Sequence, residues 1–255
     1  MPPATQSPRV VLGIESSTPA GGVALADTDG RLLAHLWRES RQPVSGRLLS
    51  DIDTLLEGYD LTREAVAAVA VTLGPGAFTG LRVGLAVAKT LAHGLSAPLF
   101  AFSTLEAAAW RTGLAGEAVA VLLDARRAEV YSGVYRLPEA PSGAMEVLRE
   151  ARAEPLASFL EAIGRTDWPT LHLTGQGADL YREALASAAG VGERLRFVPP
   201  PLDRPGADSV ARLGAHELAA GRAGRDPLTL GPVYLRVSDA EKRHRIAANL
   251  EWTAR

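Results

Sequence analysis

The sequence predicts an α/β protein in which mixed sheets are flanked by helices, and three observations support this class. Apolar runs of strand length alternate with helix-like patterns along the chain. Two stretches, "LGIESSTPAGGVAL" and "EAVAVLLDARRAEVYSGVYRL", both read as strand, polar turn and strand, so the sheet pattern starts afresh in the second half. A length of 255 residues allows one large domain or two modest ones.

The first half begins with three strands and a helix. Arg9–Ser17 is a short apolar run that ends in polar residues, which is typical of a buried strand. The "DTDG" turn at Asp27–Gly30 separates two further apolar runs and predicts a meander. Apolar residues at helical spacing predict a helix over Ser45–Tyr59, with Ser45 as its N-cap.

A glycine-rich turn, "GPGAFTGLRVG", follows the predicted strand Ala65–Leu73 and leads into a helix over Thr79–His93, whose expected N-cap is Thr79. The turn lacks the Lys-Ser/Thr ending of a P-loop, and Pro75 removes one N–H donor. The preferred interpretation is therefore that the glycines of this turn let two backbone segments approach closely, and not that the turn binds a phosphate. The helix has two apolar faces, which indicates that it packs on two neighbours.

The rest of the chain repeats this alternation. A lone Gly-x-Gly in "LTGQGADL" is a weak nucleotide signal, so a tight turn is the preferred interpretation there. The remaining elements are a strand (Pro98–Phe102), a helix capped by Ser103 or Thr104, the second hairpin, a loop (Leu137–Met145), a strand, turn and helix (Leu173–Leu185), a stiff loop (Val198–Ser209) and a helix (Val210–Ala220).

Composition excludes several classes of protein. The net charge of −2 argues against a stand-alone nucleic-acid binder, which usually shows a basic patch. The absence of cysteine excludes disulfides and thiolate metal sites. The five histidines are far apart in sequence, so no metal site is expected. No signal peptide and no apolar run of about 20 residues is found, so a soluble cytoplasmic protein is expected.

The two hairpin turns are candidate phosphate sites. In "IESSTPAGG", Glu15, Ser16 and Ser17 precede two glycines, where backbone N–H groups could bind an anion and Glu15 could hold a metal-bound water. In "LDARRAEVY", Asp124 is the corresponding acid. The alternatives are a plain polar β-turn and a solvated charged turn, and the residues alone favour them.

Five segments fall in the order found in the TsaB (YeaZ) family: "GIESSTPAGGVAL", "GPGAFTGLRVGLAVAKTLA", "STLEAAA", "LDARRAEVY" and "PVYLR". The resemblance covers about Val10 to Arg236. It implies the two-domain fold of the actin-like ATPase (sugar kinase/Hsp70/actin) superfamily. The first subdomain would span 1–102, joined by the C-terminal helix and tail of about 208–255, and a smaller second subdomain would span 103–207.

The resemblance also implies a role in bacterial synthesis of threonylcarbamoyladenosine in tRNA, in a complex with the catalytic relative TsaD and the ATPase TsaE. The catalytic relative carries a His-x-x-x-His metal motif, usually within "NHLEGH". The matching stretch here is "STLEAA", in which Thr104 and Ala108 occupy the histidine positions. The relative's adenosine-binding Gly-Gly-Val-Ala segment has no evident counterpart after Gly175. Val44 stands where the family often has His.

The resemblance thus implies a pseudo-enzyme with no catalytic residue and no metal, whose function lies in its surface. The expected partner-binding surface consists of the helices Ser45–Tyr59 and Thr79–His93, because small residues four apart leave room for a neighbouring helix. The interface residues expected on these helices are Leu48, Leu49, Ile52, Gly80, Gly84, Leu85 and Ala88. The expected partners are a TsaD-like paralogue, a TsaE-like ATPase and, for the chain alone, a second copy.

We expect tRNA to be contacted only through the complex and no membrane to be bound. No resident cofactor is expected, and ATP or ADP at the interface of the complex is left open. The alternative function is an active small-molecule kinase or ATPase of the same superfamily. It would use Glu15, Ser16, Ser17 and Gly21–Gly22 at the phosphates, with Asp124 as base or ligand of a Mg²⁺-bound water. The basic tail after Leu235 could contact RNA phosphates or be a plain charged terminus.

Overall fold

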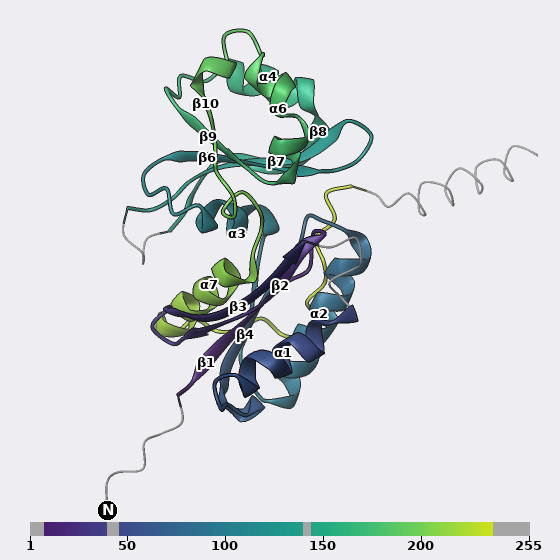
Figure 1. The fold of residues 1–255 in the computed structure, drawn as a ribbon, viewed down its shortest axis with the longest axis vertical. Helices are drawn as coiled ribbons and strands as arrows, with labels where there is room; N and C mark the ends of the chain where they lie inside the picture. Colours follow the sequence, from purple (N-terminus) through teal and green to yellow (C-terminus); the bar gives the residue numbers. More distant parts are fainter. Residues whose placement is uncertain (1–7, 40–45, 140–143, 237–255) are drawn as a thin grey trace, which may run out of the picture.

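Two five-stranded mixed sheets organise the residues that the computed structural model describes, namely 8–39, 46–139 and 144–236 (Figure 1). The first sheet contains β1 (Val10–Glu15), β2 (Ala20–Asp27), β3 (Leu32–Glu39), β4 (Val66–Thr72) and β5 (Leu99–Phe102). The second contains β6 (Ala118–Asp124), β7 (Glu129–Arg136), β8 (Glu146–Pro155), β9 (Leu171–Thr174) and β10 (Leu195–Phe197). The helices are α1 (Leu48–Glu57), α2 (Phe78–Gly94), α3 (Thr104–Arg111), α4 (Leu156–Gly164), α5 (Gln176–Leu180), α6 (Arg182–Ala186) and α7 (Ala207–Ala219).

The two sheets share one topology. Their orders are β3-β2-β1-β4-β5 and β10-β9-β6-β7-β8. In the first sheet, β1 pairs antiparallel with β2 and parallel with β4, and in the second sheet β6 pairs in the same way with β7 and β9. The prediction that mixed sheets are flanked by helices, with the pattern repeated in the second half, is confirmed.

Two helices are exchanged between the sheets. Helix α7 follows the second sheet in the chain but packs on β1, β2 and β4, whereas α3 follows the first sheet and packs on β6 and β7. Both helices lie between the two sheets and contact each other (Figure 1). We call the first sheet with α1, α2 and α7 the first lobe, and the second sheet with α3 to α6 the second lobe.

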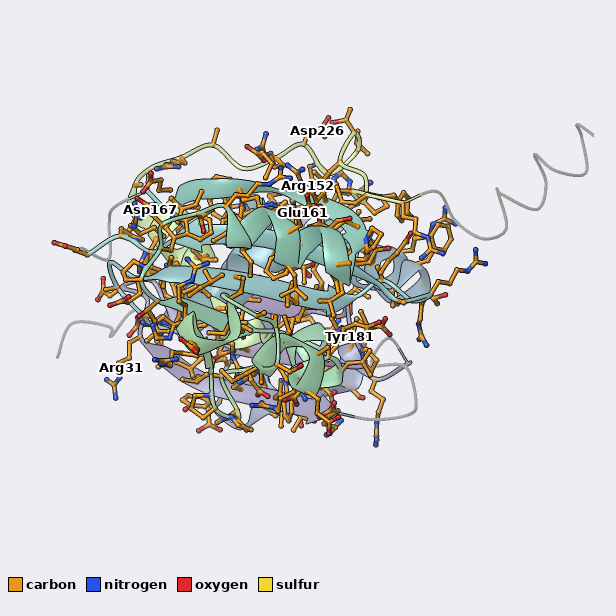
Figure 2. The ribbon with its side chains drawn as sticks, turned by 90° about the horizontal axis from the view of Figure 1, so that it is seen from above. Arg31, Arg152, Glu161, Asp167, Tyr181 and Asp226 are labelled. Atoms are coloured by element: carbon orange, nitrogen blue, oxygen red, sulfur yellow. The ribbon has the colours of Figure 1, made fainter. Side chains whose placement is uncertain are left out.

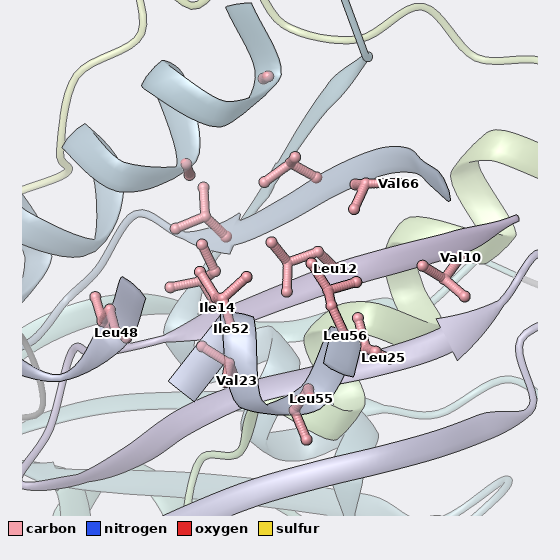
Figure 3. Packing of buried hydrophobic residues seen from close by; sticks show 14 of the residues in the cluster. Val10, Leu12, Ile14, Val23, Leu25, Leu48, Ile52, Leu55, Leu56 and Val66 are labelled. Atoms are coloured by element: carbon pink, nitrogen blue, oxygen red, sulfur yellow. The ribbon is translucent and has the colours of Figure 1, made fainter. Parts of the chain in front are cut away.

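The core of the first lobe explains why β1 reads as continuously apolar. Alternate residues of β1 face opposite sides: Leu12 and Ile14 pack beneath α1 and α2, and Val11 packs beneath α7. Helix α1 inserts Leu48, Ile52, Leu55 and Leu56 into the same cluster (Figure 3). Each fully buried leucine or isoleucine stabilises the fold by about 1.5–3 kcal/mol, so this cluster holds α1 and α2 on the sheet.

Charged residues such as Arg31 and Asp226 are exposed at the surface. Figure 2 shows Arg31 and Asp226 projecting away from the body of the molecule. Among the described residues, no helix combines the length and the apolar character that a bilayer crossing requires.

The N-termini of α3 and α2 are held in different ways. Ser103 is the N-cap of α3 and accepts a hydrogen bond from Leu105 N (3.2 Å), as predicted. The prediction for Thr79 is wrong, because α2 begins at Phe78 with Ala77 at the N-cap position. The Ala77 N–H donates to Ser17 O (2.6 Å), so a second loop, and not a side-chain cap, fixes this end of the helix. Ser45 and Val44 lie outside the described residues.

Candidate functional site

The two signature loops of the first lobe pack against each other. A Cβ at Gly76 would lie 2.7 Å from Ser17 Cβ, and a Cβ at Gly80 would overlap the carbonyl oxygen of Ser16. A Cβ at Gly84 would overlap Ser16 Oγ, which donates to Gly80 O (2.9 Å). The expectation of close backbone approach is therefore confirmed, and the approaching element is the turn after β1.

This packing corrects the predicted interface. Gly80, Gly84 and Ala88 were expected to form a ridge for a partner, but the ridge faces β1 and the turn after it. The correction has a physical reason: small residues allow close approach from either side, and here the chain's own backbone uses it. Of the seven expected interface residues, Leu48, Ile52, Gly84, Leu85 and Ala88 are buried in the first lobe, and Gly80 is half-buried. Leu49 is 55% exposed and remains available.

A cleft of about 530 Å³ lies between the lobes. The first lobe contributes Ser17–Pro19 and Gly76–Phe78. The second lobe contributes Leu123–Arg126, Tyr131 and Gln176. A C-terminal segment adds Tyr234 and Arg236. Two of the predicted phosphate-site residues, Ser17 and Asp124, thus line one cleft although they are far apart in sequence.

Glu15 and Ser16 do not line this cleft. Glu15 is fully buried, and its Oε1 accepts hydrogen bonds from the backbone N (2.6 Å) and the hydroxyl of Ser17. Its other oxygen, Oε2, has no hydrogen-bond partner among the described residues. Burial raises the pKa of Glu15, since a carboxylate loses its hydration there, and favours the neutral acid. An enclosed carboxyl whose charged form is disfavoured by burial is poorly suited to holding a metal-bound water.

Asp124 has a different environment at the opposite wall. Its Oδ1 accepts from Arg126 N (2.7 Å), and its Oδ2 lies 3.8 Å from Arg126 Nε. The turn it begins is unusual, because Arg126, Arg127 and Ala128 all have positive φ (67°, 57° and 58°). The carboxylate is therefore oriented by its own turn and remains beside the cleft.

The two residues that the resemblance matches to the histidines of the catalytic relative are internal. Thr104 and Ala108 are both buried in α3. Within the described ranges, no three His, Cys, Asp or Glu side chains gather closely enough to hold a metal ion.

Sequence reasoning did not assign Phe78, Gln176, Tyr234 or Arg236 to the cleft. The last two belong to "PVYLR", a segment that was recognised without a role. Their position could not be found from spacing, because the segment meets the cleft only after α7 has returned the chain to the first lobe.

Comparison with known proteins identifies the family. The family profile "TsaD: tRNA N6-adenosine threonylcarbamoyltransferase" matches residues 39–213. The tRNA threonylcarbamoyladenosine biosynthesis protein TsaB of Bacillus subtilis is 30% identical over 237 residues, covering 91% of this chain and 96% of the relative. The chain belongs to the TsaB family. The TsaB of Haemophilus influenzae is 32% identical over 178 residues, or 68% of this chain and 74% of the relative.

Solved structures agree with membership of the TsaB family and with the fold. YeaZ from Pseudomonas aeruginosa superimposes with a TM-score of 0.67 at 31% identity, covering 89% of this chain and 100% of that one. The activator of 2-hydroxyisocaproyl-CoA dehydratase from Clostridium difficile, solved with ADPNP, has a TM-score of 0.50 at 12% identity, over 83% of this chain and 96% of its own. The latter shows the shared fold, which is that of the actin-like ATPases.

Proposed function

We propose that the chain is a non-catalytic, cytoplasmic partner subunit in tRNA threonylcarbamoyladenosine synthesis, binding a TsaD-like transferase together with a TsaE-like ATPase. The observation that carries the proposal is the pair Thr104 and Ala108, which stand where the transferase has metal-binding histidines and are buried in α3. Neither side chain can replace an imidazole ligand. We also propose that the subdomain boundaries lie near residues 102 and 207.

The first-lobe acid supports the non-catalytic role. Glu15 ends β1 beside the cleft but is enclosed, and its pKa is raised by burial. A carboxyl that does not line the cleft, and whose charged form is disfavoured by burial, is poorly placed to position Mg²⁺ at a phosphate there.

The outward face of α2 supports the partner role. Thr79, Ala86 and Thr90 are exposed, and Val83 beside them is half-buried. These four residues recur every three or four positions, are small or β-branched, and carry no charge. Leu49 on the neighbouring α1 is also exposed. Such a surface fits a helix pair of a partner, and a second copy of the chain would occupy it when the transferase is absent.

A matched pair of arginine substitutions tests this surface. Ala86 on α2 and Ala157 on α4 are both exposed helical alanines, one on the proposed surface and one on the other lobe. We expect Ala86→Arg to reduce affinity for the purified TsaD-like partner at least about tenfold, because an interfacial charge must be desolvated. Ala157→Arg should bind like the parent, and both variants should melt like the parent. Parental affinity of Ala86→Arg, or equal losses in both variants, would contradict the surface assignment.

The cleft favours one second candidate, a small-molecule kinase or ATPase, because Ser17 of the first lobe and Asp124 of the second lobe both line it. Steady ATP turnover by the isolated chain, abolished in Asp124→Asn and retained in the surface variant Ala157→Arg, would establish that activity. Under the proposed function the isolated chain shows no such turnover.

A further inference from the structure

The last described segment, residues 225–236, runs along the first lobe as a strap that contains a turn at 227–229 and is shown in yellow in Figure 1. Three hydrogen bonds attach this C-terminal strap to the lobe: Arg225 N to Leu99 O (2.7 Å), Lys89 Nζ to Leu230 O (2.9 Å) and Val233 N to Leu73 O (2.8 Å). Leu230 also packs against the core beneath α2. The strap is therefore part of the first lobe up to Val233.

The first glycine of the signature turn accommodates the strap. Gly74 has a φ of 120°, and a Cβ there would lie 2.5 Å from the carbonyl oxygen of Val233. Immediately afterwards, the ring of Tyr234 stacks on Phe78 with centroids 5.0 Å apart, and Arg82 Nε donates to the Tyr234 hydroxyl (3.0 Å). The strap is thus fixed to the start of α2 at the mouth of the cleft.

Successive strap side chains line different cavities. Val233 and Leu235 line a cavity of about 190 Å³ next to β5 and β8, and Tyr234 and Arg236 line the interlobe cleft. The strap is a shared wall between the two spaces, so its position sets the width of both.

Arg236 reaches from this wall to the second lobe. Its side chain is 11% exposed, and its guanidinium donates to the carbonyl oxygen of Ala125 and lies 3.3 Å from Glu129 Oε2. Ala125 and Glu129 flank the β6–β7 turn, directly after Asp124 at the end of β6. One largely enclosed side chain from the strap therefore binds both ends of a turn in the second lobe.

The turn it binds is strained. Three consecutive residues, Arg126 to Ala128, have left-handed backbone conformations that non-glycine residues adopt rarely and at an energetic cost. Within the turn, Ala125 N donates to Glu129 O (3.0 Å) and Glu129 N donates to Arg126 O (3.1 Å). A strained turn persists only where its surroundings hold it, and Arg236 is one of those surroundings.

We propose that the C-terminal strap is a latch: through Arg236 it holds the β6–β7 turn in its left-handed conformation and fixes the separation of the two lobes across the cleft. Releasing Arg236 lets the turn relax and the cleft vary in width. The proposal concerns the isolated chain and does not depend on the partner role.

Hydrogen exchange of Arg236→Ala tests the turn. We expect the amides of Ala125 and Glu129 to exchange about tenfold faster than in the parent or more, while the amides of β1 and α2 keep parental rates. Arg222→Ala is the matched control, because Arg222 is an exposed arginine whose ion pair with Glu217 stays within α7 and the segment after it. It should leave the turn unchanged.

The chain contains no cysteine, so one label pair can report the lobe separation without background. Asp29 and Ala157 are exposed residues of the first and second lobes. Spin labels are placed on Asp29→Cys and Ala157→Cys, and the labelled protein is diluted with unlabelled chain before measurement. The distribution of label-to-label distances should broaden or shift when Arg236→Ala is added, and should not change when Arg222→Ala is added.

The proposal is overturned if Arg236→Ala folds and leaves both readouts parental, or if Arg222→Ala produces the same changes. Should Arg236→Ala fail to fold, Glu129→Gln decides, since it removes only the charged contact of the latch. We expect it to accelerate exchange at Ala125 to a smaller extent, and a parental rate there would overturn the proposal.

Discussion

Gly84→Ala is expected to destabilise the parent chain but to stabilise a chain in which Ser16 is replaced by glycine. In the parent, the new methyl group overlaps Ser16 Oγ and approaches Ser16 Cβ to 3.2 Å. Ser16 is buried, so its hydroxyl must turn away and give up its hydrogen bond to Gly80 O. In the Ser16→Gly background both obstructing atoms are gone.

The magnitude follows from three contributions. Alanine in place of glycine inside a helix stabilises by about 1 kcal/mol. Losing the Ser16 hydrogen bond costs about 0.5–1.5 kcal/mol, and overpacking the contact costs about 1–3 kcal/mol. Gly84→Ala should therefore destabilise the parent by about 0.5–3.5 kcal/mol but stabilise Ser16→Gly by about 1 kcal/mol, which gives a coupling energy of about 1.5–4.5 kcal/mol.

Urea unfolding of the parent, both single variants and the double variant measures this coupling. Gly80→Ala is the matched control, because its Cβ meets the backbone carbonyl of Ser16, which Ser16→Gly does not remove. It should destabilise both backgrounds alike. The reasoning is refuted if Gly84→Ala is neutral in the parent, or if Ser16→Gly rescues both glycine substitutions equally.

Three further outcomes are expected. Burial raises the pKa of Glu15, so the folded state loses stability as pH rises above the unfolded value of 4.5; Glu15→Gln should gain stability over the parent at pH 7 and not at pH 3, measured by urea unfolding. Arg111→Met leaves the partly buried Asp208 with only His35 Nδ1, at 3.8 Å, as an ion-pair partner among the described residues and should cost up to about 3–5 kcal/mol, whereas the exposed Arg63→Met should have a much smaller effect. Metal analysis of the purified chain should find no stoichiometric zinc or iron, because Thr104 stands where the catalytic relative has a metal-binding histidine. About one tightly bound ion per chain would contradict this prediction.

The fold was largely predictable because buried strands and two-faced helices leave strong patterns. Val66–Thr72 and Phe78–Gly94 lie within a few residues of their expected bounds. The strand Glu146–Pro155 was not expected: it lies at a sheet edge, where alternating charged residues face water and resemble a loop. Helix α4 directly after it and the three-residue β10 were missed as well, the latter because it is too short to show a period.

The site was less predictable, because spacing shows which residues share a face and not what covers that face. Gly80, Gly84 and Ala88 were correctly placed on one ridge of α2, but the ridge faces the lobe's own core. Gly84→Leu should therefore destabilise the chain itself and not act selectively on a partner. Ser17 and Asp124 line one cleft only because two separate hairpin turns border it.

Side chains of the strap alternate between the two cavities, so the number of residues in the strap decides which cavity each side chain enters. Removing one residue between Leu230 and Val233 would turn the remaining strap by one position. An arginine would then enter the small cavity beside Phe102 and Val147, and a leucine would face the wide cleft. Removing two residues would return the side chains to their original alternation between the cavities, but the strap would be too short to span the same distance. Among homologous chains, natural variation in this segment should therefore accumulate as exchanges of residues, while gains and losses of length fall elsewhere.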